Sequence, residues 1–183
     1  MKIIIFILSV SFVTSQSIAN IDDKFTKEID KLSRKPIIVS AFQMIEDLEP
    51  FTKKNLIELT EIPAPPFQEQ KRAAAFMSLL EDIGADQIFM DGGGNVLALK
   101  KGSGSKNILI EGHLDTVFPI ETDVKVKTSG DTLFAPGIGD DTRGLSVILT
   151  LMKVVNDLNI KTNGNIYFCG TVGEEGLGDL SGV

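Results

Sequence analysis

Apolar residues recur every three or four positions over residues 20–60, which predicts consecutive helices. Pro36 separates the first helix from the second, and Pro50 kinks the second or opens another. The same spacing predicts a helix over residues 68–82 that stops at Gly84, and an amphipathic helix that Gly144 opens. The amino-terminal half of the chain is therefore predominantly helical up to residue 84.

Short apolar runs bounded by glycine or polar residues predict strands at residues 87–90, 95–99 and 165–171, and at the run Ile108-Leu109-Ile110. The last of these is typical of a buried strand in the middle of a parallel sheet. A short hairpin is also expected, with residues 124–127 against residues 132–134. Strand, amphipathic helix and strand follow one another from residue 107 to residue 171, so the fold class is α/β.

The composition excludes some classes of protein. Hydrophobic residues make up 43% of the 183 residues, which indicates a globular chain with a sizeable core. The net charge of −7 argues against nucleic-acid binding, because phosphate recognition needs a basic face. The single cysteine, Cys169, lies in an apolar strand and is expected to behave as a small buried hydrophobe rather than as a nucleophile.

Residues 1–19 differ in composition from the rest of the chain. Lys2 is followed by an almost wholly apolar run over residues 3–13, and Ser17-Ile18-Ala19 offers small residues before a cleavage point. This pattern predicts a signal peptide and a secreted or periplasmic protein, with residues 20–183 as the mature chain. The apolar core is short for a transmembrane span, so stable membrane insertion is not expected, although an uncleaved anchor is the alternative.

The candidate chemistry follows the predicted strands. His113, the only histidine, comes directly after the run 108–110, and Asp115 lies two residues later. Asp140 follows in a glycine-rich loop, and the pair Glu174-Glu175 follows the strand at 165–171. Open α/β sheets place their chemistry at the carboxyl ends of strands, so these side chains are expected to converge. One imidazole with several carboxylates is the ligand set of a metal site.

A pair of hydrolytic metal ions needs a bridging carboxylate, a terminal nitrogen ligand and a general base. Asp140 is suited to the bridge, and His113 to the nitrogen ligand with Asp115 at its other ring nitrogen. Of Glu174 and Glu175, one would coordinate metal and the other would act as base. Taken singly, a His-x-Asp occurs by chance and a Glu-Glu pair is usually a solvated turn. Their order along the chain favours the joint interpretation.

Three blocks of residues carry a family resemblance: Gly112–Val117, Pro136–Asp141 and Gly173–Gly176. With the turn Ile62-Pro63-Ala64-Pro65, they make the chain similar to the amino-terminal part of the zinc exopeptidase and aminoacylase family, which includes carboxypeptidase G, peptidase T and succinyl-diaminopimelate desuccinylase. Two departures stand out. Many relatives have Asp-Asp-Lys-Gly where this chain has Asp140-Asp141-Thr142-Arg143-Gly144, and the family's remaining ligands and inserted dimerisation domain would lie past Val183.

The resemblance implies a mixed sheet flanked by helices, forming an incomplete catalytic domain. It implies His113, Asp140 and Glu175 as metal ligands, Glu174 as the general base and Asp115 as the partner of His113. Two zinc ions are the expected cofactors, with cobalt or manganese as alternatives. A peptide or an N-acyl amino acid is the expected substrate, and the full-length form would be a homodimer.

The function these residues favour is metal-dependent hydrolysis of a peptide or amide bond near a chain end. Two alternatives are an inactive truncated fragment with only weak metal binding and an N-acyl-amino-acid deacylase.

Overall fold

The computed structural model describes residues 23–183, and the predicted signal peptide at residues 1–19 lies outside them. The helices are α1 (Asp23–Ser33), α2 (Pro36–Asp47), α3 (Glu49–Thr60), α4 (Gln70–Ile83) and α5 (Arg143–Asp157), with short turns η1 (Ile138–Thr142) and η2 (Gly176–Gly178). The strands are β1 (Gln87–Met90), β2 (Val96–Lys100), β3 (Asn107–His113), β4 (Lys127–Ser129), β5 (Thr132–Phe134) and β6 (Asn165–Thr171). Among residues 23–183, no helix combines the length and apolarity that crossing a membrane requires.

Of the described residues, 23–35 belong to a first unit and 36–183 form a second. The helix of this first unit, α1, is amphipathic, and Phe25, Ile29 and Leu32 lie exposed along its apolar face. The rest of the fold, including the candidate site, belongs to the second unit.

The predicted helix boundaries in this region are confirmed by the residues that start and stop each helix. Pro36 is the first residue of α2, and Pro50 opens α3 instead of kinking α2, because a proline in the first turn loses no hydrogen bond. Gly84 ends α4 with a positive φ of 87°, a left-handed conformation that glycine adopts without a Cβ clash.

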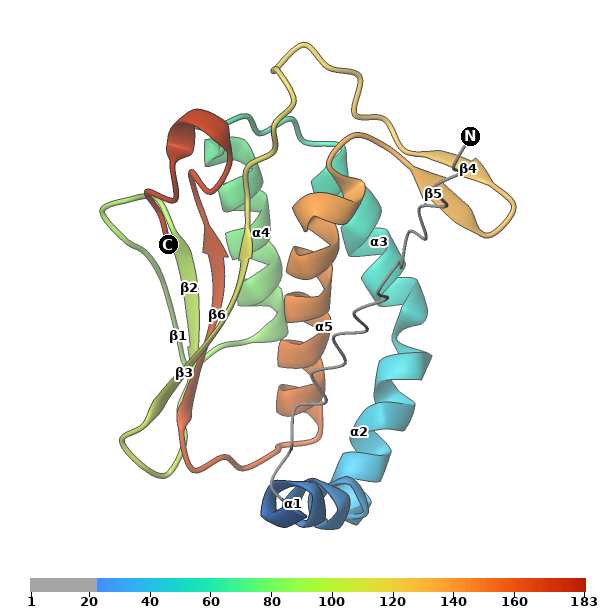
Figure 1. Ribbon diagram of the computed structural model, residues 1–183, viewed down its shortest axis with the longest axis vertical. Helices are drawn as coiled ribbons and strands as arrows, with labels where there is room; N and C mark the ends of the chain where they lie inside the picture. The colour runs from blue at the N-terminus through green and yellow to red at the C-terminus, as the bar shows by residue number, and fades with distance from the viewer. Residues whose placement is uncertain (1–22) are drawn as a thin grey trace, which may run out of the picture. The chain divides into compact units, whose positions relative to one another are not determined.

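A four-stranded mixed sheet in the order β1-β2-β6-β3 forms the centre of the second unit. β2 pairs antiparallel with both β1 and β6, whereas β3 and β6 run parallel and are joined through α5. Helices α4 and α5 cover one face of this sheet, and α3 packs on α5 (Figure 1). The predicted α/β class with a mixed sheet and flanking helices is confirmed.

The hydrophobic core lies between the sheet and the α4–α5 layer. Its fully buried large side chains include Leu59, Phe76, Leu80, Val96, Leu114, Leu145, Leu149, Met152 and Phe168. Cys169 is buried in β6, and burial raises the pKa of its thiol to about 12. The expectation that Cys169 behaves as a buried hydrophobe is therefore confirmed.

The predicted central position of β3 is wrong. β6 lies between β2 and β3, so β3 is an edge strand, and Ile108 and Leu109 are 51% and 57% exposed. An apolar run indicates a strand that can be buried, but the order of strands in the sheet decides whether it is.

The predicted hairpin is shifted along the chain. β4 begins at Lys127, not Val124, because the two-residue turn Gly130-Asp131 pairs Ser129 with Thr132 and thereby sets the register. Val124 is instead buried, and the backbone N–H of Val126 donates to the carboxylate of Glu61 at 3.1 Å.

Close packing at Gly170 of β6 predicts a loss of stability on substitution. A Cβ at this position would lie 2.9 Å from the Phe76 ring and 3.2 Å from Cδ2 of Leu114, both fully buried. We expect Gly170→Ala to lower the free energy of unfolding in urea by about 1–3 kcal/mol, the usual cost of overpacking. Gly92→Ala, where nothing lies within 4 Å of the added Cβ, is the matched control. Equal stability of the two variants would contradict the expectation.

The loop between β1 and β2 contains a carboxylate, that of Asp91, whose pKa is lower in the folded chain than in the unfolded chain. Oδ1 of Asp91 accepts the backbone N–H groups of Gly93, Gly94 and Asn95 at 2.9–3.0 Å, and Oδ2 accepts Nδ2 of Asn95. Desolvation acts to raise the pKa of Asp91, but these hydrogen bonds together outweigh it and hold the pKa below its ordinary value of 3.8.

A depressed pKa in the folded state means that ionised Asp91 stabilises the fold above about pH 3.8, and that this contribution is lost as the pH falls through the folded-state pKa. Asp91→Asn should therefore be less stable than the wild type at pH 7, by about 1 kcal/mol for the weakened hydrogen bonds. The difference should shrink below pH 4 in urea titrations from pH 3 to 7. A constant difference over that range would be inconsistent with this role.

Candidate metal centre

The predicted site lies at the carboxyl ends of the parallel strands β3 and β6. His113, the last residue of β3, pairs with Thr171, the last residue of β6, so residues that follow both strands emerge at the same edge of the sheet. Glu174 and Glu175 come three and four residues after the end of β6. The geometry thus follows from two parallel strands in register.

The loop before α5 brings Asp140 to the same edge. Gly137 has a φ of 74°, and the buried Thr142 donates from its hydroxyl to the Gly137 carbonyl at 2.9 Å. A Cβ on Gly137 would lie 2.6 Å from Cγ2 of Thr116, so only glycine fits there. The Asp140 side chain projects from this turn and is 81% exposed.

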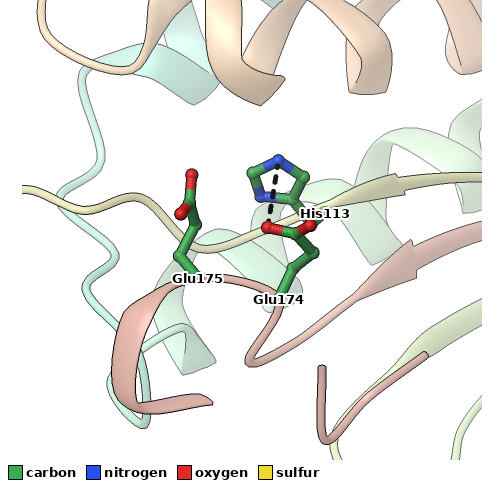
Figure 2. A group of neighbouring side chains, drawn as sticks. All are labelled: His113, Glu174 and Glu175. Carbon is green, nitrogen blue, oxygen red and sulfur yellow. Dashed lines mark ion pairs between the residues drawn. The ribbon is translucent and has the colours of Figure 1, made fainter. Parts of the chain in front are cut away.

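The imidazole of His113 lies among the carboxylates. Its Nε2 is 3.0 Å from Oδ1 of Asp140 and 4.0 Å from Oε2 of Glu174. Glu174 and Glu175 flank the ring, and one ligand atom from each of these three residues lies within 4.8 Å of the others (Figure 2). The structure therefore brings His113, Asp140, Glu174 and Glu175 together, as the spacing along the chain predicted.

Asp115 makes a different contact from the one expected. Nδ1 of His113 is 3.0 Å from the backbone carbonyl oxygen of Asp115, and its carboxylate oxygen is farther, at 3.7 Å. The fully buried Asp115 carboxylate instead accepts the backbone N–H groups of Glu174 and Glu175 at 3.1 and 2.8 Å. Asp115 thus orients the ring through its backbone and holds the two-glutamate loop through its side chain.

The carbonyl contact defines the role of each ring nitrogen. A carbonyl oxygen only accepts, so Nδ1 of His113 carries a hydrogen and Nε2 is the nitrogen that can bind a metal ion. Burial acts to lower the pKa of His113, but hydrogen bonds involving Asp115 and Asp140 outweigh it and raise the pKa to about 9. The proton on Nε2 is therefore held by Asp140, at the position a metal ion would take.

Two carboxyl groups near the ring, those of Glu175 and Asp141, have a pKa above the ordinary value. Burial, followed by the charges of Asp140 and Glu174, raises the pKa of Glu175. Burial also raises the pKa of Asp141, whose Oδ1 accepts the backbone N–H of Gly144 at 3.0 Å. One imidazole and a group of carboxylates, two of which have a raised pKa, fit a divalent cation, whose charge would compensate theirs.

Comparison with known proteins shows which family the site-bearing segment resembles. Residues 109–183, which contain most of β3, all of α5 and β6, and all the candidate ligands, match the sequence pattern of Peptidase family M20/M25/M40. This segment of the chain is therefore similar to members of that peptidase family, called M20 below.

Among curated M20 relatives, carboxypeptidase G2 of Pseudomonas sp. (strain RS-16) is 32% identical over 124 residues, covering 62% of this chain and 30% of the relative. The chain therefore spans about a third of the length of this relative. Human carnosine dipeptidase 1 superimposes with a TM-score of 0.61 at 16% identity, over 74% of this chain and 34% of that one. A tripeptidase of Staphylococcus aureus superimposes with a TM-score of 0.58 at 23% identity, over 72% of this chain and 39% of that one. These likenesses show the M20 fold.

Two residues near this site were not predicted from the sequence. Glu69 and Arg72, at the start of α4, are 3% and 0% exposed. Glu69 contacts the loop after β6, and Arg72 contacts the end of β3. In sequence they resemble ordinary polar residues of a helix's first turn, since the predicted apolar face of that helix contains Ala73 and Phe76. The only sequence signal for them is a pair of charged residues three positions apart next to the apolar face of the helix. That pattern is also common on solvent-exposed helices, so it does not distinguish buried from exposed charges.

Proposed function

We propose that this chain carries metal-binding residues of a hydrolase that cleaves a peptide or amide bond near a chain end with an activated water. One observation supports the proposal most directly. Nε2 of His113 faces Asp140 and Glu174, and Glu175 lies beside them, at the carboxyl ends of two parallel strands. This is the ligand chemistry that similarity to the family implies.

In the proposed site, His113, Asp140 and Glu175 would hold the metal, with zinc as the expected ion and cobalt or manganese as alternatives. When bound, the metal ions supply a Lewis acid that polarises the substrate carbonyl and lowers the pKa of water. The 81% exposed side chain of Asp140 leaves the open side of the site accessible to a substrate.

Glu174 is the proposed general base. Its side chain is 37% exposed and its Oε2 lies 4.0 Å from the imidazole, so it faces both solvent and the ligand nitrogen. It takes a proton from the attacking water and delivers it to the leaving amine. Asp115 positions this carboxylate, because it binds the backbone N–H of Glu174 itself.

Short peptides with a free terminus are the preferred candidate substrates. The family is one of peptidases, and the names carboxypeptidase, dipeptidase and tripeptidase of the similar proteins each describe cleavage near a chain end. N-acyl amino acids offer the same amide bond and form the second candidate class.

Equilibrium dialysis with zinc, followed by hydrolysis assays on dipeptides, tripeptides and N-acyl amino acids, tests the proposal. We expect zinc binding, turnover that a chelator abolishes and zinc restores, and no cleavage of peptides blocked at both ends. Zinc binding without turnover would favour a metal-binding chain that is not a complete enzyme. Absence of both would overturn the proposal.

A further inference from the structure

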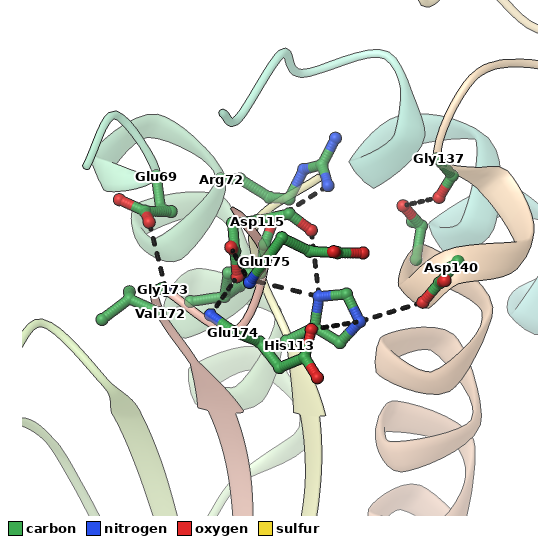
Figure 3. A network of polar contacts seen from close by, with 12 residues as sticks. Glu69, Arg72, His113, Asp115, Gly137, Asp140, Val172, Gly173, Glu174 and Glu175 are labelled. Carbon is green, nitrogen blue, oxygen red and sulfur yellow. Dashed lines mark hydrogen bonds and ion pairs between the residues drawn. The ribbon is translucent and has the colours of Figure 1, made fainter. Parts of the chain in front are cut away.

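Two buried charged side chains, Glu69 and Arg72, lie at the amino-terminal end of α4, beside the candidate metal centre (Figure 3). Charged side chains are almost never buried completely unless their charge is paired or fully hydrogen-bonded. Their partners include backbone groups of the two segments that carry the predicted ligands. That choice of partners points to a role in the site.

Glu69 holds the loop that carries Glu174 and Glu175. Its Oε1 accepts the backbone N–H of Gly173 at 3.2 Å and that of Phe67 at 2.9 Å. The next two backbone N–H groups, of Glu174 and Glu175, donate to the carboxylate of Asp115. Three consecutive N–H groups are therefore bound by two buried carboxylates that come from different elements, which leaves the loop little freedom to move.

Arg72 holds the strand end that carries His113. Its Nη1 donates to the carbonyl oxygen of Leu114 at 2.9 Å, and Leu114 is the residue between His113 and Asp115. Its Nε and Nη2 donate to the carbonyl oxygen of Ile62. Burial lowers the pKa of Arg72 to about 10, with the charge of Asp115 opposing it, so the side chain stays cationic at neutral pH.

Glu69 and Arg72 are three residues apart on one helix, so their relative positions are set by a rigid element. One contacts the loop after β6 and the other contacts the end of β3. We propose that Glu69 and Arg72 are positioning residues, and that the first turn of α4 sets the separation between the His113 imidazole and the two glutamates. The inference rests on the proposed metal-dependent function, and it names the residues that hold that site in shape.

The test measures loop order and metal affinity separately. Amide hydrogen exchange of the metal-free full chain reports whether Gly173, Glu174 and Glu175 are held, and zinc affinity is measured by competition with a chelator. In Glu69→Ala we expect exchange at Gly173 to be at least about 10-fold faster, since a hydrogen bond to a charged group is lost. Zinc affinity should fall about 10- to 100-fold, the usual effect of losing a residue that supports metal ligands.

Matched variants separate positioning from general destabilisation. Glu69→Gln keeps an acceptor oxygen and should restore exchange and zinc affinity to within about threefold of the wild type. Glu69→Asp keeps the charge but withdraws the oxygen by one methylene, so its exchange rate and zinc affinity should change as described for Glu69→Ala. It serves as the test variant if Glu69→Ala does not fold. Glu81→Ala, which removes an exposed carboxylate of the same helix, should change neither measurement.

The variant Arg72→Lys keeps the charge but removes the planar guanidinium, which reaches the carbonyl groups of Leu114, Ile62 and Thr60. Zinc affinity should therefore again fall about 10- to 100-fold. Normal exchange at Gly173 together with normal zinc affinity in Glu69→Ala or Glu69→Asp would overturn the inference. If the wild type binds no zinc, the proposed function fails, and the exchange rate of the Gly173 amide still decides whether Glu69 holds the loop.

Discussion

Glu174→Gln is expected to lower kcat by about 10²- to 10⁴-fold, the contribution of a positioned general base. Glutamine keeps the shape of the side chain but cannot accept the proton of the attacking water. The backbone N–H of Glu174 would still donate to Asp115, so the loop should keep its geometry. Steady-state hydrolysis of a peptide that the wild type cleaves measures the effect.

The decisive companion measurement is metal affinity, because ligand atoms of Glu174, Glu175 and His113 lie within 4.8 Å of one another. A base should leave the zinc dissociation constant nearly unchanged when it becomes an amide. Glu175→Gln, the matched variant of the neighbouring residue, should weaken zinc binding instead. If Glu174→Gln weakened zinc binding as much as Glu175→Gln did, the two roles would have to be exchanged or shared.

His113→Ala is expected to abolish the stabilisation that metal confers. A ligand that binds only the folded chain stabilises it by about 2.7 kcal/mol when its free concentration is 100 times the dissociation constant. His113 supplies the only imidazole of the sequence, and its Nε2 is the nitrogen left for a metal once Nδ1 donates to the Asp115 carbonyl. Thermal unfolding with and without zinc, and again after adding a chelator, measures the effect.

The control for His113→Ala is Glu111→Gln, which removes an exposed charge from the same strand two residues away. This variant should respond to zinc as the wild type does. An equal zinc-dependent rise in melting temperature for His113→Ala and the wild type would show that the metal binds elsewhere, and would remove the main support for the proposed function.

The elements of the fold were largely predictable because their signals are local. Proline at the start of a helix, glycine at its end and apolar residues at helical spacing act within a few residues, so α2, α3, α4 and α5 match the predictions closely. The register of the β4–β5 hairpin was predicted wrongly, because the prediction followed the apolar residues before the turn. The turn Gly130-Asp131 instead sets the register by pairing Ser129 with Thr132. The burial of β3 was missed because strand order is not a local property.

For the site, the sequence by itself determined which side chains end the two strands. Because β3 and β6 are parallel and in register, His113, Glu174 and Glu175 had to emerge at one edge of the sheet. The glycines before Asp140 likewise indicated a tight loop. The convergence of ligands follows from strand direction and loop length, which a single sequence contains.

Only the tertiary structure decided what holds these side chains in place. It assigned the Asp115 carboxylate to the N–H groups of Glu174 and Glu175, and it buried Glu69 and Arg72 against Gly173 and Leu114. Residues 69 and 173 are 104 positions apart, and their contact depends on how α4 packs on the sheet. Such contacts cannot be derived from the sequence pattern, because a polar residue in a helix's first turn looks the same whether solvent or a neighbouring backbone satisfies it.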